Sequence, residues 1–184
     1  VKAKVQVRFT ALPLTPWTFF ERIPTSSSLG KLVSLRGTVI RTGSLKMQEF
    51  CKEWQCTRCK TRQTTFVDDY QYGLIGKPIF CTGAVDGVSC KNVKFEEFQT
   101  CDGEDKKKHV DYQEIKMQEL TSVLEIGAVP RSIVVLLRDD LVDRCRAGDD
   151  VIITGILGCR MKTPLKADSS RLDGELFLQA SSIQ

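Results

Sequence analysis

Alternation of apolar and polar residues predicts a β-strand near the start of the chain. In "KLVSLRGTVIRTG" (residues 31–43), Val33, Leu35 and Val39 alternate with polar residues. A period of two is typical of a strand with one buried face. Gly37 interrupts the pattern and is expected at a β-bulge, because a glycine inside a strand often marks one.

Three further segments continue the strand pattern. "SLKMQEFCKEWQ" (44–55) is expected to partner the first strand. "DYQEIKMQEL" (111–120) alternates again, with Ile115 and Met117 facing away from its charged residues. "RSIVVLLRD" (131–139) is apolar at successive positions, which predicts a central strand buried on both faces.

The C-terminal third predicts a short helix and a long hairpin. "RDDLVDRCRAGDD" (138–150) has an Asp near its start and Gly148 at the position of a C-terminal cap, as in a short helix. "DVIITGILG" (150–158) and "GELFLQASSI" (174–183) are expected to pair. They predict a projecting hairpin over 158–175 with a basic, polar tip.

These elements predict a mainly β protein with an OB-fold, a five-stranded Greek-key barrel that carries an inserted zinc-binding lobe. Residues 31–55 and 101–184 are expected to form the barrel, and 56–100 the lobe. Residues 1–30 form a lead-in segment, expected to be irregular and packed by Trp17, Phe19 and Phe20.

Composition supports a folded domain. The 184 residues are 41% hydrophobic and 27% charged, which is ordinary for a globular protein. No apolar run approaches the ~20 residues of a membrane span, and the first residues lack the apolar stretch of a signal peptide, which together predict an intracellular protein. The formal charge of +4 permits a polyanionic partner without requiring one.

The sequence has eight cysteines, and their spacing indicates a metal site. Cys56 and Cys59 form a Cys-x-x-Cys pair. The surrounding sequence opens no helix after a strand, as a redox pair of the thioredoxin type would, and without a secretory signal disulfides are disfavoured. A zinc knuckle is the better interpretation, because two thiolates at this spacing can bind one tetrahedral ion.

Cys81 and Cys90 are the expected second half of the site. Eight residues separate them, a wider spacing than usual, so Cys101 and His109 stay as substitutes. Four thiolates leave no position for water, and the zinc would therefore be structural. The remaining cysteines outside the knuckle are interpreted as packed side chains: Cys51, Cys145 and Cys159.

The sequence contains no convincing pattern of catalytic residues. No Gly-x-x-x-x-Gly-Lys-Ser/Thr sequence is present, so this chain is not expected to hydrolyse ATP or to be an enzyme by itself. The carboxylates between Asp139 and Asp150 lack a neighbouring His or nucleophile, which favours helix capping over acid–base chemistry. A zinc hydrolase is a distant alternative.

Several separated stretches resemble one family. "SLGKLVSLRGTVIRTGSLK", "DYQEIKMQE", "GAVPRSIVVLLRDDLVDRCRAGDDVIITGIL" and "LFLQASSIQ" are similar to the N-terminal domain of minichromosome-maintenance (MCM) DNA helicases, in the family's order. The resemblance covers residues 5–184. The resemblance is strongest to the ninth paralogue, the repair-associated branch, and next strongest to the eighth. This sequence departs from the family's pattern in the wide spacing between Cys81 and Cys90, where most replicative paralogues have a second Cys-x-x-Cys pair.

The resemblance implies a DNA-binding collar of a six-membered ring. The hairpin at 158–175 matches a family hairpin that points into the channel, which implies DNA contact by Lys162, Lys166 and Arg171, with Arg160 behind them. Arg41 and Lys46 match the family's single-strand-binding basic positions. Lysine and arginine there would neutralise phosphates without reading bases.

The resemblance also implies partners. Zn²⁺ is the expected cofactor, and ATP belongs to a motor domain outside this chain. Single-stranded and duplex DNA and other MCM subunits are the expected partners, with the eighth paralogue in a hetero-hexamer, in the nucleus, in DNA replication and in repair by homologous recombination. The alternative is a zinc-stabilised assembly module with little DNA binding of its own. The stretch 120–129 matches a loop that couples the collar to the motor.

Overall fold

The fold was determined as a computed structural model that describes residues 7–85, 87–98, 109–161 and 174–184. The chain divides into two compact units. One comprises Val1–Lys46 with Asp111–Gln184, and the other comprises Met47–Val110; we call them the barrel unit and the lobe. Among the described residues, no helix has the length and hydropathy of a membrane span.

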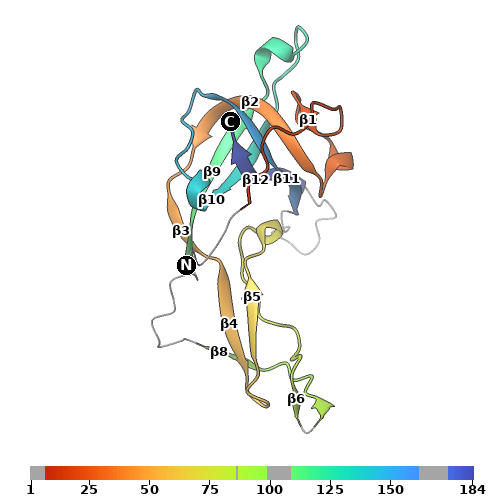
Figure 1. Ribbon diagram of the computed structural model, residues 1–184, viewed down its shortest axis with the longest axis vertical. Helices are drawn as coiled ribbons and strands as arrows, with labels where there is room; N and C mark the ends of the chain where they lie inside the picture. The colour runs from red at the N-terminus through yellow and green to blue at the C-terminus, as the bar shows by residue number, and fades with distance from the viewer. Residues whose placement is uncertain (1–6, 86, 99–108, 162–173) are drawn as a thin grey trace, which may run out of the picture. The chain divides into compact units, whose positions relative to one another are not determined.

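Five long strands form the barrel (Figure 1): β2 (Leu32–Thr42), β9 (His109–Gln118), β10 (Ser132–Arg138), β11 (Asp150–Met161) and β12 (Gly174–Ile183). β2 pairs with β9, β9 with β10, β10 with β12, β12 with β11, and β11 returns to β2. The pairings therefore form a circuit through all five strands.

The order of the circuit identifies the fold. All of its pairs are antiparallel except β10 with β12, which run parallel. One parallel pair between the third and fifth strands of a five-stranded Greek key is the arrangement of an OB-fold. The predicted fold class is confirmed.

Alternating side chains of the strands form the core. The buried set is apolar: Ile23, Val33, Leu35, Val39, Ile115, Met117, Ile133, Val135, Leu137, Leu141, Cys145, Val151, Ile153, Leu157 and Leu178. The predicted inward faces of the first strand and of Ile115 with Met117 are confirmed. Leu136 is also buried, on the opposite face of β10, as expected for a central strand.

The bulge in β2 lies after the position that the sequence predicted. The pairing of β2 with β11 is regular at Gly37, which lies opposite Val151, and the pairing of β2 with β9 shifts between Val39 and Arg41. Gly37 serves another purpose, because a Cβ there would lie 2.4 Å from the backbone oxygen of Gln118. In a regular strand the side chain of Arg41 would point inward, on the same face as that of Val39. Ile40 is instead an extra residue in the pairing, so the side chains of both Ile40 and Arg41 are exposed.

The helix predicted over 138–150 is wrong. Only a single 3₁₀ turn forms, at Asp139–Leu141. The backbone N–H groups that a helix would use inside itself have other partners, since Asp143 donates to the Gln113 side chain at 2.9 Å and Arg146 to Asp149 at 2.7 Å. Gly148 donates to the Val39 carbonyl at 2.7 Å and so joins the turn to β2 instead of capping a helix.

The lead-in segment contains more regular structure than predicted. β1 (Phe19–Phe20) pairs in parallel with β2, and a 3₁₀ turn follows at Ser26–Ser28. Phe20 packs against the core, but Trp17 is 78% exposed, so the prediction that Trp17 packs the segment is wrong.

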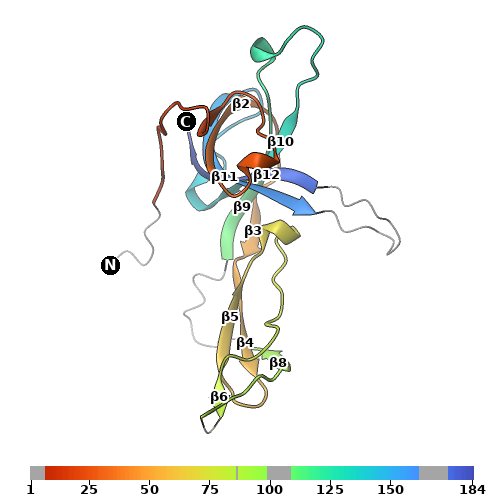
Figure 2. The same ribbon diagram turned by 90° about the vertical axis from the view of Figure 1, so that its right-hand side faces the viewer.

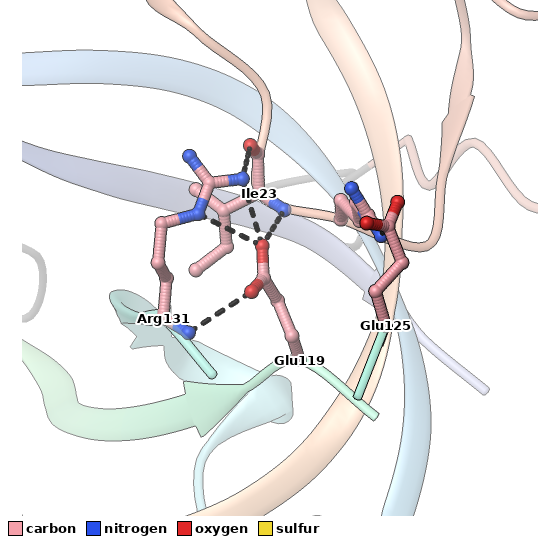
Figure 3. A network of polar contacts seen from close by, with 5 residues as sticks. Ile23, Glu119, Glu125 and Arg131 are labelled. Atoms are coloured by element: carbon pink, nitrogen blue, oxygen red, sulfur yellow. Dashed lines mark hydrogen bonds and ion pairs between the residues drawn. The ribbon is translucent and has the colours of Figure 1, made fainter. Parts of the chain in front are cut away.

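A buried carboxylate joins the lead-in segment to β10 (Figure 3). Glu119 is 4% exposed and accepts hydrogen bonds from the backbone N–H groups of Ile23 at 2.7 Å and Arg131 at 2.9 Å. The guanidinium of Arg131 donates to the same carboxylate from Nη2 at 2.8 Å and to the Ile23 carbonyl at 2.7 Å. Because Glu119 and Arg131 flank a loop with a 3₁₀ turn at Thr121–Val123, this clasp fixes the base of that loop.

Glu119→Gln is expected to weaken the clasp and lower the free energy of unfolding by about 1–3 kcal/mol, since buried donors lose a charged acceptor. Burial raises the pKa of Glu119, but the N–H groups of Arg131 and Ile23 and the Arg131 guanidinium outweigh it and hold that pKa below its usual range. The carboxylate therefore stabilises the fold above the unfolded pKa of about 4.3, and this contribution is lost as pH falls through the lower folded pKa.

Urea unfolding of the wild type and Glu119→Gln at neutral pH and in acid measures both effects. The difference between the two proteins should shrink in acid. A difference that stays constant with pH would contradict the role of the carboxylate charge. Glu125, whose carboxylate is 87% exposed and lies 3.6 Å from Arg22, provides the control variant Glu125→Gln.

The lobe is built from short strands (Figure 2). β4 (Cys51–Cys56) lies between β5 (Arg62–Phe66) and β8 (Phe95–Glu97) in a three-stranded antiparallel sheet. β6 (Ala84–Val85) pairs with β7 (Val88–Ser89). The remaining elements are β3 (Lys46–Glu49), at the junction of the two units, and a 3₁₀ turn at Asp69–Gln71.

The arms of the C-terminal hairpin run side by side (Figures 1 and 2). β11 pairs with β12 from Ile153 with Ile183 to Met161 with Gly174. The register shifts between Thr154 and Gly155. Residues 162–173 lie outside the described residues, so the positions of Lys162, Lys166 and Arg171 are not described.

Candidate functional site

Four cysteines of the lobe converge on one point. The Sγ atoms of Cys56, Cys59, Cys81 and Cys90 all lie within 4.8 Å of one another. Cys56 Sγ is 3.8 Å from Cys90 Sγ, and Cys59 Sγ is 3.3 Å from Cys81 Sγ. With Zn–S bonds of about 2.3 Å, a tetrahedral ion places two sulfurs about 3.8 Å apart. The spacing therefore fits four ligands of one metal ion.

Backbone turns place the two halves of the cluster. β4 ends at Cys56, and Lys60, at φ +58°, turns the chain back so that the Lys60 N–H donates to the Cys56 carbonyl at 3.1 Å. The other half is a loop in which the Cys90 N–H donates to the Gly83 carbonyl at 2.9 Å. This bond brings the two ends of the 81–90 loop together, which explains how the wide spacing closes the cluster.

Polar groups surround the sulfurs. The Asn92 side-chain amide lies 3.3 Å from Cys56 Sγ, and the Gly83 N–H lies 3.3 Å from Cys81 Sγ. The Thr61 hydroxyl is 3.1 Å from Cys59 Sγ. Hydrogen bonds of this kind orient metal ligands and stabilise negative charge on sulfur. Gly83 has no room for a side chain, because a Cβ there would lie 2.3 Å from the Thr61 hydroxyl oxygen.

The thiols differ in acidity. Burial raises the pKa of Cys56, but the Cys59 backbone N–H and the Asn92 amide outweigh it and lower that pKa to about 6. Burial raises the pKa of the Cys81 thiol to about 12, and it also raises the pKa of Cys90. Four thiolates this close repel one another, so full ionisation requires a cation among them. The donor set fits a soft divalent metal ion and leaves no oxygen ligand that Ca²⁺ or Mg²⁺ would prefer.

Other candidate ligands lie elsewhere. His109 is outside the cluster, in β9, and Cys51 is in β4 opposite Phe66. Cys101 lies outside the described residues. Cys145 is buried in the barrel core, as predicted, whereas Cys159 is only half-buried.

The barrel unit carries a cavity of about 340 Å³ on the outer face of β9. Arg41, on β2, and Lys46, at the start of β3, line it together with Lys116 of β9. Arg41 and Lys116 are direct cross-strand partners. Like charges placed opposite each other are unfavourable unless an anion lies between them.

These cations have no acidic partner among the residues that the structure describes. The only carboxylate lining the cavity is that of Glu114, which is engaged by Tyr112 Oη at 2.5 Å and Arg160 Nη1 at 3.3 Å. The positive charge of Arg41, Lys46 and Lys116 is therefore available to an anionic ligand. Lys116 was missed as a site residue, because its role depends on pairing with β2; its place on the outer face of an alternating strand was the available signal.

Arg160 occupies a different environment. It is 5% exposed, its guanidinium lies 4.7 Å from the centre of the Phe177 ring, and it donates to Glu114. Such burial leaves little of the guanidinium for an external ligand. Its contacts instead fix the Glu114 carboxylate at the edge of the cavity.

Comparison with known proteins places this architecture in a family. The family described as "MCM OB domain" matches residues 22–161, most of the barrel unit and the whole lobe. The chain belongs to the MCM family.

Three MCM proteins are compared with this chain, and the one with the highest identity is named a probable DNA helicase. The Arabidopsis thaliana protein "Probable DNA helicase MCM9" is 41% identical over 155 residues, 84% of this chain and 23% of that protein. "Probable DNA helicase MCM8" of the same plant is 34% identical over 132 residues, 71% of this chain and 15% of that protein. "DNA replication licensing factor MCM6", also from Arabidopsis thaliana, is 30% identical over 151 residues, which is 82% of this chain and 16% of that protein.

The chain thus spans less than a quarter of the length of each of these MCM relatives. The predicted resemblance to an MCM N-terminal domain, most similar to MCM9 and next to MCM8, is confirmed. The comparisons show an MCM OB domain, and the structure shows a metal-compatible cysteine cluster and a basic cavity in the same chain.

Proposed function

We propose that this chain is the DNA-binding N-terminal collar of a hexameric MCM helicase, stabilised by zinc in its lobe. The observation that carries the proposal is the cavity lined by Arg41, Lys46 and Lys116, where three cations lack an acidic partner among the described residues. In an OB-fold, such a basic groove is typical of single-strand binding.

Phosphate is the ligand that this cavity suits best. Lysine and arginine side chains bind phosphate oxygens without distinguishing bases, and the affinity depends on salt because counterions are released. A ring that moves along DNA of any sequence requires contacts of this kind. Lys162, Lys166 and Arg171 extend the proposed DNA contact to the hairpin tip, and buried Arg160 supports it from behind through Glu114.

Zinc is the proposed metal of the lobe, held by Cys56, Cys59, Cys81 and Cys90. When bound, it supplies a positive charge that stabilises four thiolates and cross-links the turn after β4 to the 81–90 loop. The cysteines complete its tetrahedral coordination, which leaves no place for a catalytic water. The metal is structural in this proposal, and the chain itself is not an enzyme.

The remaining parts of the proposal concern the assembled protein. ATP hydrolysis belongs to a motor domain outside this chain. The partners are DNA and other MCM subunits, with the eighth paralogue in a hetero-hexamer that acts in nuclear DNA replication and repair by homologous recombination. The similarity to proteins named MCM9 and MCM8 supports this choice.

A second function is favoured by the surface of the lobe. Ile79, Phe80, Val88 and Val93 are 84%, 57%, 70% and 68% exposed, and their apolar area is available for burial against another subunit. They support the alternative of an assembly module in which the lobe makes subunit contacts and the isolated chain binds DNA negligibly.

Binding of labelled single-stranded DNA over a salt series tests the proposal, with fluorescence anisotropy as the measurement. The wild type should bind more weakly as salt rises. Arg41→Ala combined with Lys116→Ala should reduce the slope of log affinity against log salt by about 1.4, because each lost phosphate contact removes ~0.7 on single strands. Lys31→Ala, an exposed lysine outside the cavity, is the matched control.

Two results would decide against DNA binding by the cavity. An unchanged slope in the double variant would place the contacts elsewhere. No binding by the wild type even at low salt would favour the assembly module, which sizing of the chain with the eighth paralogue would then examine.

A further inference from the structure

An aromatic ring lies among the cations of the cavity. Tyr112 is half-buried on the outer face of β9, two residues before Glu114 and four before Lys116 on the same side of the strand. It lines the cavity with Arg41 and Lys46. An aromatic side chain beside unpaired cations combines the two groups that hold a nucleotide, one for the base and one for the phosphate.

Hydrogen bonds hold this ring in place. The Tyr112 hydroxyl donates to Glu114 Oε1 at 2.5 Å, and the same oxygen accepts from the buried Arg160 at 3.3 Å. The guanidinium carbon of Arg138 lies 5.9 Å from the centre of the Tyr112 ring, within cation–π range. A ring fixed before binding loses little rotamer freedom when a ligand stacks on it.

The backbone at Gly43 packs tightly against β9 at the edge of the cavity. Gly43 approaches β9 so closely that a Cβ there would lie 2.7 Å from the Glu114 carbonyl oxygen, and its N–H donates to that oxygen at 2.7 Å. The volume of about 340 Å³ falls within the range of small-molecule sites. This volume is sufficient for a single base with its sugar.

We propose that Tyr112 is a stacking platform for one unpaired nucleobase, whose flanking phosphates contact Arg41, Lys46 and Lys116. This inference rests on the proposed function and adds a substrate preference to it. The bases of a duplex are stacked on one another and cannot reach the ring, so the subsite selects single strands. Stacking tolerates any base, because each has a π-face.

An abasic oligonucleotide separates stacking from phosphate binding. Two labelled single strands of equal length are compared, one of thymidines and one of abasic sugar–phosphate units, which carries the charge without bases. The wild type should prefer the thymidine strand. Tyr112→Leu should weaken thymidine binding by about 10-fold and leave abasic binding unchanged, since base stacking on an aromatic residue contributes ~1–3 kcal/mol.

Tyr112→Phe is the matched variant, because it keeps the ring and loses only the bond to Glu114. It should keep the preference for thymidine. Equal loss on both strands in Tyr112→Leu, or loss of the preference in Tyr112→Phe, would overturn the stacking role and assign Tyr112 to positioning of Glu114. If Tyr112→Leu fails to fold, photocrosslinking of the wild type to 5-iodouracil DNA decides, and a crosslink that maps away from Tyr112 would refute the proposal.

The two proposals fail differently. If abasic binding depends on Arg41 while Tyr112→Leu changes neither strand, the phosphate site stands and the stacking platform is wrong. If the wild type binds neither strand in a salt-dependent way, the DNA-binding function is wrong and the stacking proposal falls with it.

Discussion

Chelation of the metal at neutral pH should unfold the lobe and leave the barrel unit folded. Between Met47 and Phe98, where the structure describes burial, the buried apolar side chains are Trp54 and three cysteines of the cluster, so almost no hydrophobic core would remain. In zinc-finger peptides, metal binding contributes ~10–16 kcal/mol of folding free energy. The barrel unit has its own apolar core and does not depend on the metal.

Tryptophan fluorescence gives a reporter for this transition. The chain has two tryptophans: Trp54 in the lobe, 5% exposed with its Nε1 bonded to Thr65 at 2.8 Å, and Trp17, 78% exposed. In a Trp17→Phe background, chelation should shift the emission of Trp54 to the red, and added zinc should restore it. Retention of the native emission after complete metal removal would show that the lobe does not need the ion.

Cysteine variants extend the same experiment to the ligands. Cys81→Ser should abolish binding of about one zinc ion per chain, as a ligand of a closed tetrahedral site must. Cys51→Ser is the control, because Cys51 lies in β4 outside the cluster. Equal zinc content in both variants would contradict the assignment of Cys81.

Gly155→Ala is expected to destabilise the barrel unit by about 3 kcal/mol, at the upper end of overpacking effects. A Cβ at Gly155 would lie 2.2 Å from the backbone oxygen of Gln179 and 3.0 Å from the Ala180 Cα. The neighbouring atoms are backbone, which cannot rotate away as a side chain would. Relief of the clash therefore requires β11 and β12 to separate at the register shift beside Thr154.

Gly76→Ala is the matched control, since nothing lies within 4 Å of the added Cβ and the backbone at Gly76 does not have a positive φ. Urea unfolding followed by far-UV circular dichroism compares the two variants. A Gly155→Ala protein as stable as the wild type would mean that the two strands can shift at this point without loss of packing.

Local patterns were sufficient to predict most of the strands and the lobe's cysteines. Apolar residues at every second position, such as Ile115 and Met117, identify a buried face wherever the strand is regular. Cys56 and Cys59 were predictable because a short spacing places both sulfurs at one turn. Cys81 and Cys90 were harder, since their approach depends on the Gly83 to Cys90 hydrogen bond within the loop.

Features that depend on neighbouring strands were not predictable from local patterns. The bulge between Val39 and Arg41 arises from the pairing of β2 with β9, and nothing in "TVIRTG" marks Ile40 as the extra residue. Lys116 joins the basic cavity only through its cross-strand position opposite Arg41. The predicted helix failed because Gln113, distant in sequence, takes the Asp143 N–H.

The connection that carries the lobe has an evolutionary consequence. The chain leaves the barrel after Thr42 and returns along β9, where Thr42 pairs with Ile115, so the two attachment points are already held together without the insertion. Lengthening a segment that closes on paired strands costs only ~0.6 kcal/mol for each doubling. Insertions and deletions during divergence should accumulate in the lobe between its four clustered cysteines, whereas a one-residue insertion or deletion between Val33 and Val39, where β2 is regular, would turn buried side chains outward and should be eliminated by selection.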